Sequence, residues 1–155
     1  MRERPAPEIV ASAWLNTSEP LSLETLKGRV VILYAFQQKC EGCLHSALPQ
    51  AKALHAEYSS SDLAVIGLHC PFAAASLANR GALEEFILQQ GITFPVAMDA
   101  DGPLWEPETF ARYGMQGTPA VVLIGRNGKR RLQHLGTMND GELRQAIQTL
   151  LSEPG

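Results

Sequence analysis

Two cysteines three positions apart are the residues of this chain best suited to chemistry. They stand in the segment Cys40-Glu41-Gly42-Cys43, between a continuous apolar run and a stretch with helical periodicity. That placement puts Cys40 at a helix N-terminus, where unpaired backbone N–H groups and the helix dipole favour an anion such as a thiolate. We therefore expect Cys40 to have a lowered pKa and to act as a nucleophile. Cys43, one turn later, is close enough to form a disulfide with it.

Two other interpretations of this pair remain open. Half of a zinc site has the same spacing, but the chain contains no second C-x-x-C segment and no H-x-x-x-H segment to complete it. Two ordinary buried cysteines would need no chemistry at all. A redox-active dithiol is favoured over both, because the pair lies where a strand gives way to a helix.

The residues next to the cysteines should set the stability of the thiolate. Glu41 carries a negative charge between the cysteines and should oppose the Cys40 thiolate, whereas Lys39 and His45 should favour it. Because a less stable thiolate goes with a more stable disulfide, Glu41 predicts a reducing rather than a strongly oxidising protein. The alternative is that Glu41 only complements the helix dipole from the first turn.

A proline begins a later apolar run, in Gly117-Thr118-Pro119 followed by residues 120–124. A trans proline is allowed there, because its missing N–H lies outside the strand ladder. A cis Thr118–Pro119 bond would instead direct the Thr118 backbone towards a docking peptide, which would add to the sheet like a strand. The residues alone leave both conformations open, and X–Pro bonds in general favour trans.

The elements that must position these residues alternate along the chain. Apolar runs and period-2 patterns predict strands at residues 30–36, 63–68, 94–98, 120–124 and 129–135. Helical periodicity predicts helices at residues 41–58, 83–91, 104–113 and 140–151. Asn127-Gly128 predicts a type I′ hairpin turn, and Asn139 or Asp140 caps the last helix. The order predicts an α/β fold with a mixed central sheet, helices on both faces and an N-terminal extension, residues 1–28, that is irregular or a hairpin.

Length and composition exclude several classes of protein. The chain has 155 residues, 45% hydrophobic and 19% charged, which suits a single domain over residues 1–155. Its formal net charge is −3, so nucleic-acid binding is not expected. The longest apolar run, Val30 to Phe36, is far shorter than the roughly 20 residues that cross a bilayer, and no signal-peptide pattern follows Met1. We expect no membrane segment and a cytoplasmic location for the chain as written, or a periplasmic one for a trimmed mature form.

Other polar groups have less specific surroundings. Cys70 follows His69 at the end of a predicted strand, the edge of an open α/β sheet that carries functional loops. Cys70 is interpreted first as a small buried hydrophobic residue, with an extra redox thiol or an intermolecular disulfide as alternatives. His69 is expected to be a hydrogen-bonded packing residue, and the acidic stretch from Asp99 to Glu108 a solvated loop without calcium-site spacing.

Short segments, each weak alone, occur in a specific order over most of the chain. They are Trp14-Leu15-Asn16, Pro20-Leu21-Ser22-Leu23, Leu26-Lys27-Gly28-Arg29-Val30-Val31, Cys40-Glu41-Gly42-Cys43-Leu44-His45, Val65-Ile66-Gly67-Leu68-His69, Tyr113-Gly114, Thr118-Pro119-Ala120, and Leu123-Ile124 before Asn127-Gly128. Together they resemble the thioredoxin-fold thiol–disulfide oxidoreductases of the TlpA-like, redoxin-related group, particularly the domain of DipZ-type proteins. The resemblance implies a thioredoxin-like fold with Cys40 as attacking cysteine, Cys43 as resolving cysteine, and Pro119 as a cis proline facing them.

Three positions depart from the pattern of that group. Lys39 stands where thioredoxin-like proteins commonly have tryptophan, and Gly42 stands where proline is frequent. Tyr34 occupies the place of a buried aspartate in thioredoxin itself. Because such a carboxylate can accept the proton of Cys43, its absence leaves the general base unassigned. The departures bear on partner choice and reduction potential more than on reaction class.

The sequence thus predicts a thiol–disulfide oxidoreductase that exchanges disulfides with protein substrates in the reducing direction. A separate reductant recycles it, and neither a metal nor an organic cofactor is expected. One alternative is a peroxiredoxin-like thiol peroxidase, which needs Thr or Ser three residues before its reactive cysteine; Gln37 and Cys40 stand at those places. The other is a metal-handling or redox-silent module that uses the groove at Pro119 only for docking.

Overall fold

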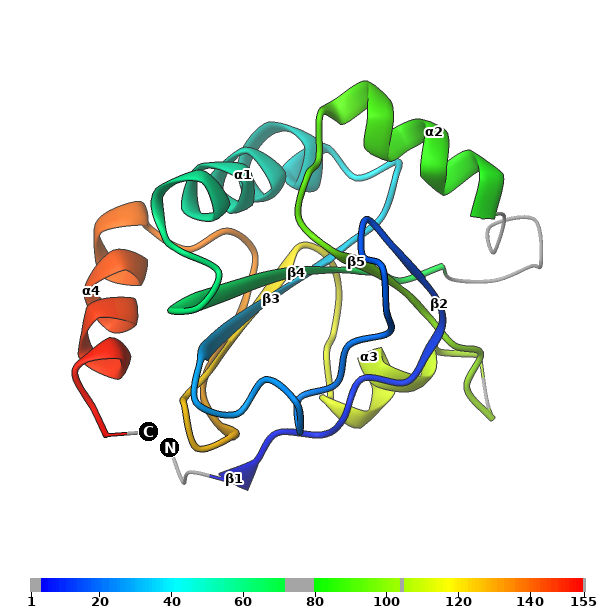
Figure 1. Ribbon diagram of the computed structural model, residues 1–155. Helices are drawn as coiled ribbons and strands as arrows, with labels where there is room; N and C mark the ends of the chain where they lie inside the picture. Colours follow the sequence, from blue (N-terminus) through cyan, green and yellow to red (C-terminus); the bar gives the residue numbers. More distant parts are fainter. Residues whose placement is uncertain (1–3, 72–79, 104, 155) are drawn as a thin grey trace.

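The computed structural model describes residues 4–71, 80–103 and 105–154, which form a seven-stranded mixed sheet with helices on both faces (Figure 1). The strands are β1 (Arg4–Pro5), β2 (Ala11–Leu15), β3 (Val30–Phe36), β4 (Leu63–His69), β5 (Val96–Asp99), β6 (Ala120–Ile124) and β7 (Lys129–Leu135). The helices are η1 (Cys43–Ala47), α1 (Leu48–Glu57), α2 (Arg80–Gln90), α3 (Glu108–Arg112) and α4 (Asp140–Leu151). The strand order is β1-β7-β6-β3-β4-β5-β2.

The centre of the sheet consists of β3 with its neighbours β4 and β6. β3 runs parallel to β4 and antiparallel to β6, so that Ile32 lies between Val65 and Leu123. Every residue of these three strands is buried, as expected for apolar runs without polar alternation. The predicted mixed central sheet is confirmed.

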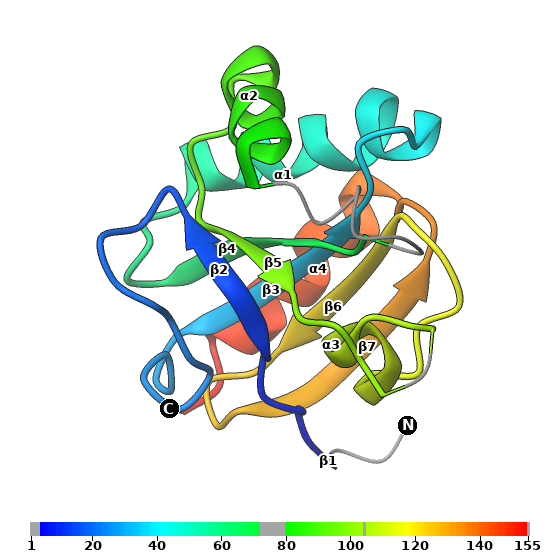
Figure 2. The same cartoon turned by 90° about the vertical axis from the view of Figure 1, so that its right-hand side faces the viewer.

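Alternate side chains of β3 enter two separate cores. Ile32 belongs to the core that α1, α2 and α4 cover, whereas Leu33 belongs to the core beneath α3 and the N-terminal segment. Figures 1 and 2 show α3 on the side of the sheet away from α1 and α4. Both the strands and the helices therefore keep the arrangement that the sequence predicts.

The N-terminal extension does not fold back on itself as a hairpin. β1 pairs with β7 at one edge of the sheet, and β2 pairs with β5 at the other edge. The two strands are therefore separated by the whole width of the sheet (Figure 2). The extension is an integral part of the sheet because the exposed pair Arg4–Pro5 adds to β7 and the more apolar β2 adds to β5.

Two local predictions are corrected. The helix expected over residues 41–58 is interrupted by the π-helical turn η1, in which the Leu48 N–H bonds to the Cys43 carbonyl; Pro49, which has no N–H, follows. The hairpin before β7 is not type I′, because Asn127 lacks the positive φ that such a turn requires. Gly128 alone has it (φ 80°), and its N–H bonds to the Gly125 carbonyl at 2.9 Å.

The last helix of the chain, α4, has the predicted bounds and cap. α4 spans the predicted residues, and the Asn139 side chain accepts a hydrogen bond from the Glu142 N–H at 3.0 Å, as an N-cap does. Among the described helices, none combines the length and apolar character that a membrane crossing requires.

Candidate active site

Cys40 and Cys43 form a disulfide in the short segment that connects β3 to η1. Their Cα atoms are 5.2 Å apart, within the range that a disulfide spans without backbone movement. The run of buried β3 residues holds the preceding backbone rigidly, and Cys40 itself lies just past the strand. The predicted pair is therefore brought together as a redox-capable dithiol.

The two sulfur atoms have different surroundings. Cys40 is partly exposed, whereas Cys43 is completely buried (0% exposed). The Cys43 N–H donates a hydrogen bond to the Cys40 Sγ at 3.2 Å. A donor at the first helical turn stabilises a negative charge on that sulfur, which is also the more exposed of the two.

Pro119 lies directly against the cysteine segment. The Thr118–Pro119 peptide bond is cis, as the resemblance implies. A Cβ atom placed on Gly42 would be 3.1 Å from Pro119 Cδ, which is tighter than an ordinary contact. Gly42 and Pro119 therefore lie against each other, although η1, α1, β4, α2, β5 and α3 separate them in sequence.

Gln37 joins the segments on the two sides of Cys40. The Thr118 hydroxyl donates to Gln37 Oε1 at 3.1 Å, and Gln37 Nε2 donates to the Cys70 carbonyl at 3.3 Å. In the sequence, Gln37 stands out only as a residue that does not fit a peroxidase motif. A polar side chain directly after a fully apolar strand could have indicated its bridging role, because such a group needs hydrogen-bond partners when it is partly buried.

The predicted tuning residues lie at the surface. Lys39, Glu41 and Gly42 are all exposed around the disulfide. Tyr34, in the place of thioredoxin's aspartate, is buried, and its hydroxyl donates to Gln50 Oε1 at 2.8 Å. Burial raises the pKa of Tyr34 above its usual range, so this phenol keeps its proton and does not replace a carboxylate base.

Cys70 lies one residue beyond β4 and belongs to the core under α3, on the opposite face of the sheet from Cys43. Its side chain is 0% exposed and donates to the Leu68 carbonyl at 3.4 Å. Burial raises the pKa of the Cys70 thiol well above its usual value. The structure does not bring this sulfur together with the predicted pair.

Asp99 is not part of a solvated loop, contrary to the sequence-based interpretation of residues 99–108. It is 2% exposed, and its two carboxylate oxygens accept hydrogen bonds from the Thr109 and Phe110 N–H groups at 2.7 and 2.8 Å. Burial raises its pKa despite these bonds. Asp99 therefore fastens the start of α3 to the end of β5.

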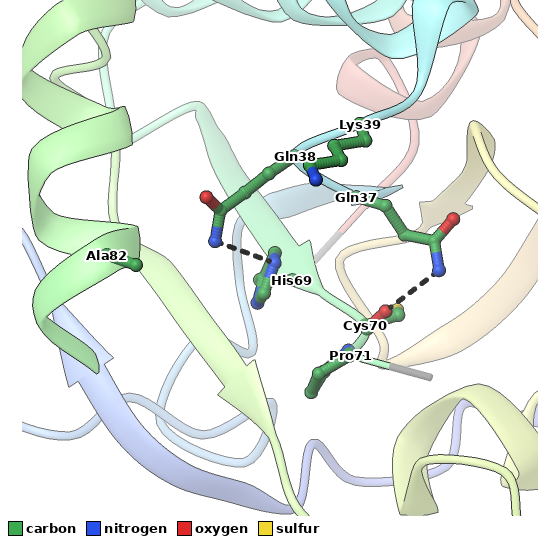
Figure 3. Close-up of a pocket in the computed structure, with 7 residues that line it drawn as sticks. All are labelled: Gln37, Gln38, Lys39, His69, Cys70, Pro71 and Ala82. Atoms are coloured by element: carbon green, nitrogen blue, oxygen red, sulfur yellow. Dashed lines mark hydrogen bonds between the residues drawn. The ribbon is translucent and has the colours of Figure 1, made fainter. Parts of the chain in front are cut away.

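A pocket of about 210 Å³ lies between the segment that precedes Cys40 and the end of β4 (Figure 3). Residues 37–39, the end of β4 and Ala82 of α2 line it. His69 is one of these residues, and its ring packs against the Phe36 ring at an angle of 57°, with 5.4 Å between the ring centres. No group of three or more potential metal ligands occurs among the described residues.

Comparison with known proteins gives the site a context. The redoxin family model matches residues 2–150. NHL repeat-containing protein 2 of Bos taurus is 37% identical over 130 residues, and protein DipZ of Mycobacterium tuberculosis is 28% identical over 144 residues. These matches cover 77% and 92% of this chain but only 17% and 20% of the relatives, so the chain spans at most about a fifth of their length.

Solved structures match over nearly the whole of both chains. A thiol–disulfide isomerase from Corynebacterium glutamicum is 37% identical, with a TM-score of 0.89 and coverage of 96% of this chain and 97% of its own. A thioredoxin-like superfamily protein is 35% identical, with a TM-score of 0.94 and coverage of 97% and 98%. With the Cys40–Cys43 disulfide at the end of β3, these similarities show that the chain belongs to the redoxin family and has the fold of the thioredoxin-like thiol–disulfide oxidoreductases.

Proposed function

We propose that the protein reduces disulfide bonds in protein substrates through Cys40 and Cys43. The observation that carries this proposal is the asymmetry of the pair. Cys40 Sγ is accessible and accepts the Cys43 N–H bond, whereas Cys43 is buried behind it. An exposed, stabilised thiolate next to a protected second thiol suits a two-step exchange.

The exchange conserves electrons and protons in each step. The Cys40 thiolate attacks one sulfur of the substrate disulfide, a Cys40–substrate S–S bond forms, and the other substrate sulfur leaves as a thiolate that takes a proton. Cys43 then loses its proton and attacks Cys40 Sγ, which releases the second substrate thiolate. The substrate disulfide gains two electrons, and the enzyme dithiol becomes the Cys40–Cys43 disulfide. A recycling reductant returns those two electrons, and no metal or organic cofactor is required.

Pro119 and Thr118 supply the docking position in this proposal. Pro119 contacts the cysteine segment at Gly42, so a substrate segment extended along Thr118 would bring its cysteine to Cys40. Pairing with backbone atoms is tolerant of side-chain identity. This arrangement supports action on more than one protein substrate.

Glu41 supports the reducing direction. Its exposed carboxylate lies between the cysteines and opposes the thiolate, which favours the disulfide form of the enzyme. A Glu41→His variant should therefore raise the reduction potential by about 20 mV, because an exposed charge contributes at most about 1 kcal/mol. A redox titration in dithiothreitol buffers measures this shift. An unchanged or lower potential would remove the argument for direction.

The reaction itself is tested by trapping. Reduced Cys43→Ser protein should accumulate a mixed disulfide between Cys40 and a disulfide-containing protein, because the resolving thiol is gone. The matched Cys40→Ser variant should accumulate none, since Cys43 is buried. Mass spectrometry identifies the linked residues. If the wild-type protein reduces no disulfide and Cys43→Ser traps nothing, the proposed function is wrong.

A further inference from the structure

Thr118 combines a paired side chain with unpaired backbone groups. Its hydroxyl donates to Gln37 Oε1 at 3.1 Å, whereas its backbone N–H and C=O have no hydrogen-bond partner among the described residues. The strand ladder of β6 with β3 and β7 begins only at Ala120, after the cis bond between Thr118 and Pro119. The N–H and C=O of Thr118 are therefore the groups with which a docking strand would pair.

The Cys70 carbonyl fixes the orientation of the Gln37 side-chain amide. Gln37 Nε2 donates to this carbonyl at 3.3 Å (Figure 3). Because a carbonyl only accepts, the reversed amide would place Oε1 against another oxygen. Oε1 therefore faces Thr118, and the Thr118 hydroxyl donates its single proton to it. The carbonyl is itself held in place, since the Cys70 N–H donates to the Phe36 carbonyl at 3.0 Å.

A threonine hydroxyl without such a partner competes for nearby backbone groups. Threonine side chains bond readily to their own or to a neighbouring backbone N–H or C=O. A bond of this kind at Thr118 would occupy the groups that a substrate strand needs. The bond to Gln37 instead uses the only proton of the hydroxyl and fixes its oxygen, so that the Thr118 backbone stays available.

We infer that Gln37 is a positioning residue for exchange with polypeptide disulfides, because it holds the Thr118 hydroxyl away from the backbone that pairs with the substrate. The inference rests on the proposed function and adds a determinant of its substrate class. A small disulfide without a peptide backbone has no N–H or C=O to pair with Thr118. Gln37 should therefore favour extended polypeptide disulfides over small ones.

The test compares a disulfide that has a peptide backbone with one that has none. The probes are a dimer of alanine-rich synthetic peptides, joined through one cysteine in each chain, and bis(2-hydroxyethyl) disulfide. Each is mixed in excess with the fully reduced protein. Cys40 displaces one thiol of the probe, Cys43 displaces the second, and two electrons pass from the protein dithiol to the probe.

The measured quantity is the peptide-to-small-disulfide ratio of second-order rate constants for formation of the Cys40–Cys43 disulfide. Acid quenching and mass spectrometry of time points give both constants. Gln37→Leu should lower the ratio about fivefold, the size expected when one hydrogen bond is redirected. With the peptide, the loss should appear in the half-saturating concentration rather than in the maximal rate, because Gln37 acts on docking.

A conservative variant distinguishes positioning from a structural bridge. Gln37→Glu keeps an oxygen that accepts from Thr118 but, as a carboxylate, loses the donor to Cys70. The ratio should therefore stay within about twofold of the wild-type value, although the bridge to β4 is broken. The added charge near Cys40 acts on both probes alike and cancels in the ratio. Gln145→Leu, at an exposed site of α4, is the matched control and should not change it.

A double-variant cycle tests whether Gln37 acts through the Thr118 hydroxyl. Gln37→Leu should cost about fivefold in the protein with Thr118 but less than about twofold in the Thr118→Val protein, which has no hydroxyl to redirect. A residue that merely braced this region would cost the same in both proteins. Should Gln37→Leu fail to fold, Gln37→Met, whose side chain has a similar length, takes its place.

The outcomes separate this inference from the proposed function. If neither probe oxidises the reduced wild-type protein, the proposed function fails. If both probes do, the positioning role is wrong when Gln37→Leu keeps the wild-type ratio. It is equally wrong when Gln37→Glu loses as much as Gln37→Leu, or when the cost of Gln37→Leu is the same with and without the Thr118 hydroxyl.

Discussion

On the β6 side of the cysteine segment, Gly42 and Pro119 lie so close together that an added Cβ would come within 3.1 Å of the proline ring, whereas on the β4 side a pocket of about 210 Å³ lies between residues 37–39 and the end of β4. The first side consists of the Thr118 backbone and the tight contact between Gly42 and the Pro119 ring. The second is open and is lined by Gln37, Gln38 and the exposed Lys39, with His69 in its wall. The difference teaches that the two sides of one cysteine segment can be filled to very different degrees.

The largest expected effect is the difference in alkylation rate between Cys40 and Cys70, the cysteine that follows β4. In the reduced native protein, iodoacetamide should modify Cys40 at least about 100-fold faster than Cys70, because the Cys70 thiol is fully buried, has a raised pKa and reacts only after local opening. Mass spectrometry of time points measures both rates, and a sample in denaturing urea is the control in which both react. Comparable native rates, or a Cys40–Cys70 disulfide, would show that Cys70 is an extra redox thiol.

Acid should lower the free energy of unfolding because of His69, the buried residue at the end of β4. The folded-state pKa is about 4 against about 6.5 when unfolded, so the unfolded chain binds more protons between these values and stability falls as the pH is lowered through that window. From pH 7 to about pH 4.5 the wild type should lose about 2 kcal/mol more than His69→Phe. Urea unfolding at both pH values measures this difference. Asp99, whose raised pKa acts in the opposite direction, is present in both proteins and cancels.

Overfilling the β6 side should reduce exchange with proteins. Gly42→Val places side-chain atoms against Pro119 and should lower kcat/KM for a protein disulfide about tenfold, since reacting groups are displaced. The matched control is Gly117→Ala, whose new Cβ would lie 3.5 Å from Leu135 Cδ1, an ordinary contact. Equal rates for the two variants would mean that the close contact at Gly42 does not position the substrate.

The smallest expected effect is that of replacing Gln37, which bonds to Thr118 on the β6 side and to Cys70 on the β4 side. Gln37→Leu removes the bonds to Thr118 and to the Cys70 carbonyl and should lower the free energy of unfolding by about 1 kcal/mol. Gln145→Leu, at an exposed site of α4, should change it by less than about 0.5 kcal/mol. Urea unfolding at pH 7 distinguishes them, and identical midpoints would show that Gln37 does not hold the two sides together.

The parts that were predictable from the sequence are those with strong local signals. Val30–Phe36, Ala120–Ile124 and Asp140–Leu151 occur at the predicted bounds because apolar periodicity and an Asn139 cap act over neighbouring residues. The cysteine spacing likewise indicated the disulfide.

The remaining features depend on contacts between segments far apart in sequence. Asp99 is buried because α3 supplies two N–H donors ten and eleven positions later, and no acidic-loop pattern reveals such partners. His69 is buried without a hydrogen-bond partner for Nδ1 among the described residues, and no local pattern in the sequence reveals this. The absence of a hairpin in the first residues likewise reflects a competition between partners along the whole chain.

The strands at the two edges of the sheet have a consequence for synthesis. β1 is made first and pairs with β7, and β2 pairs with β5, so both pairings connect residues that leave the ribosome at very different times. Contacts of such sequence separation slow folding and leave strand edges uncovered meanwhile. β1 therefore stays unpaired until β7, the last strand of this sheet to be made, has emerged, and this interval is when newly made copies are most exposed to association with one another.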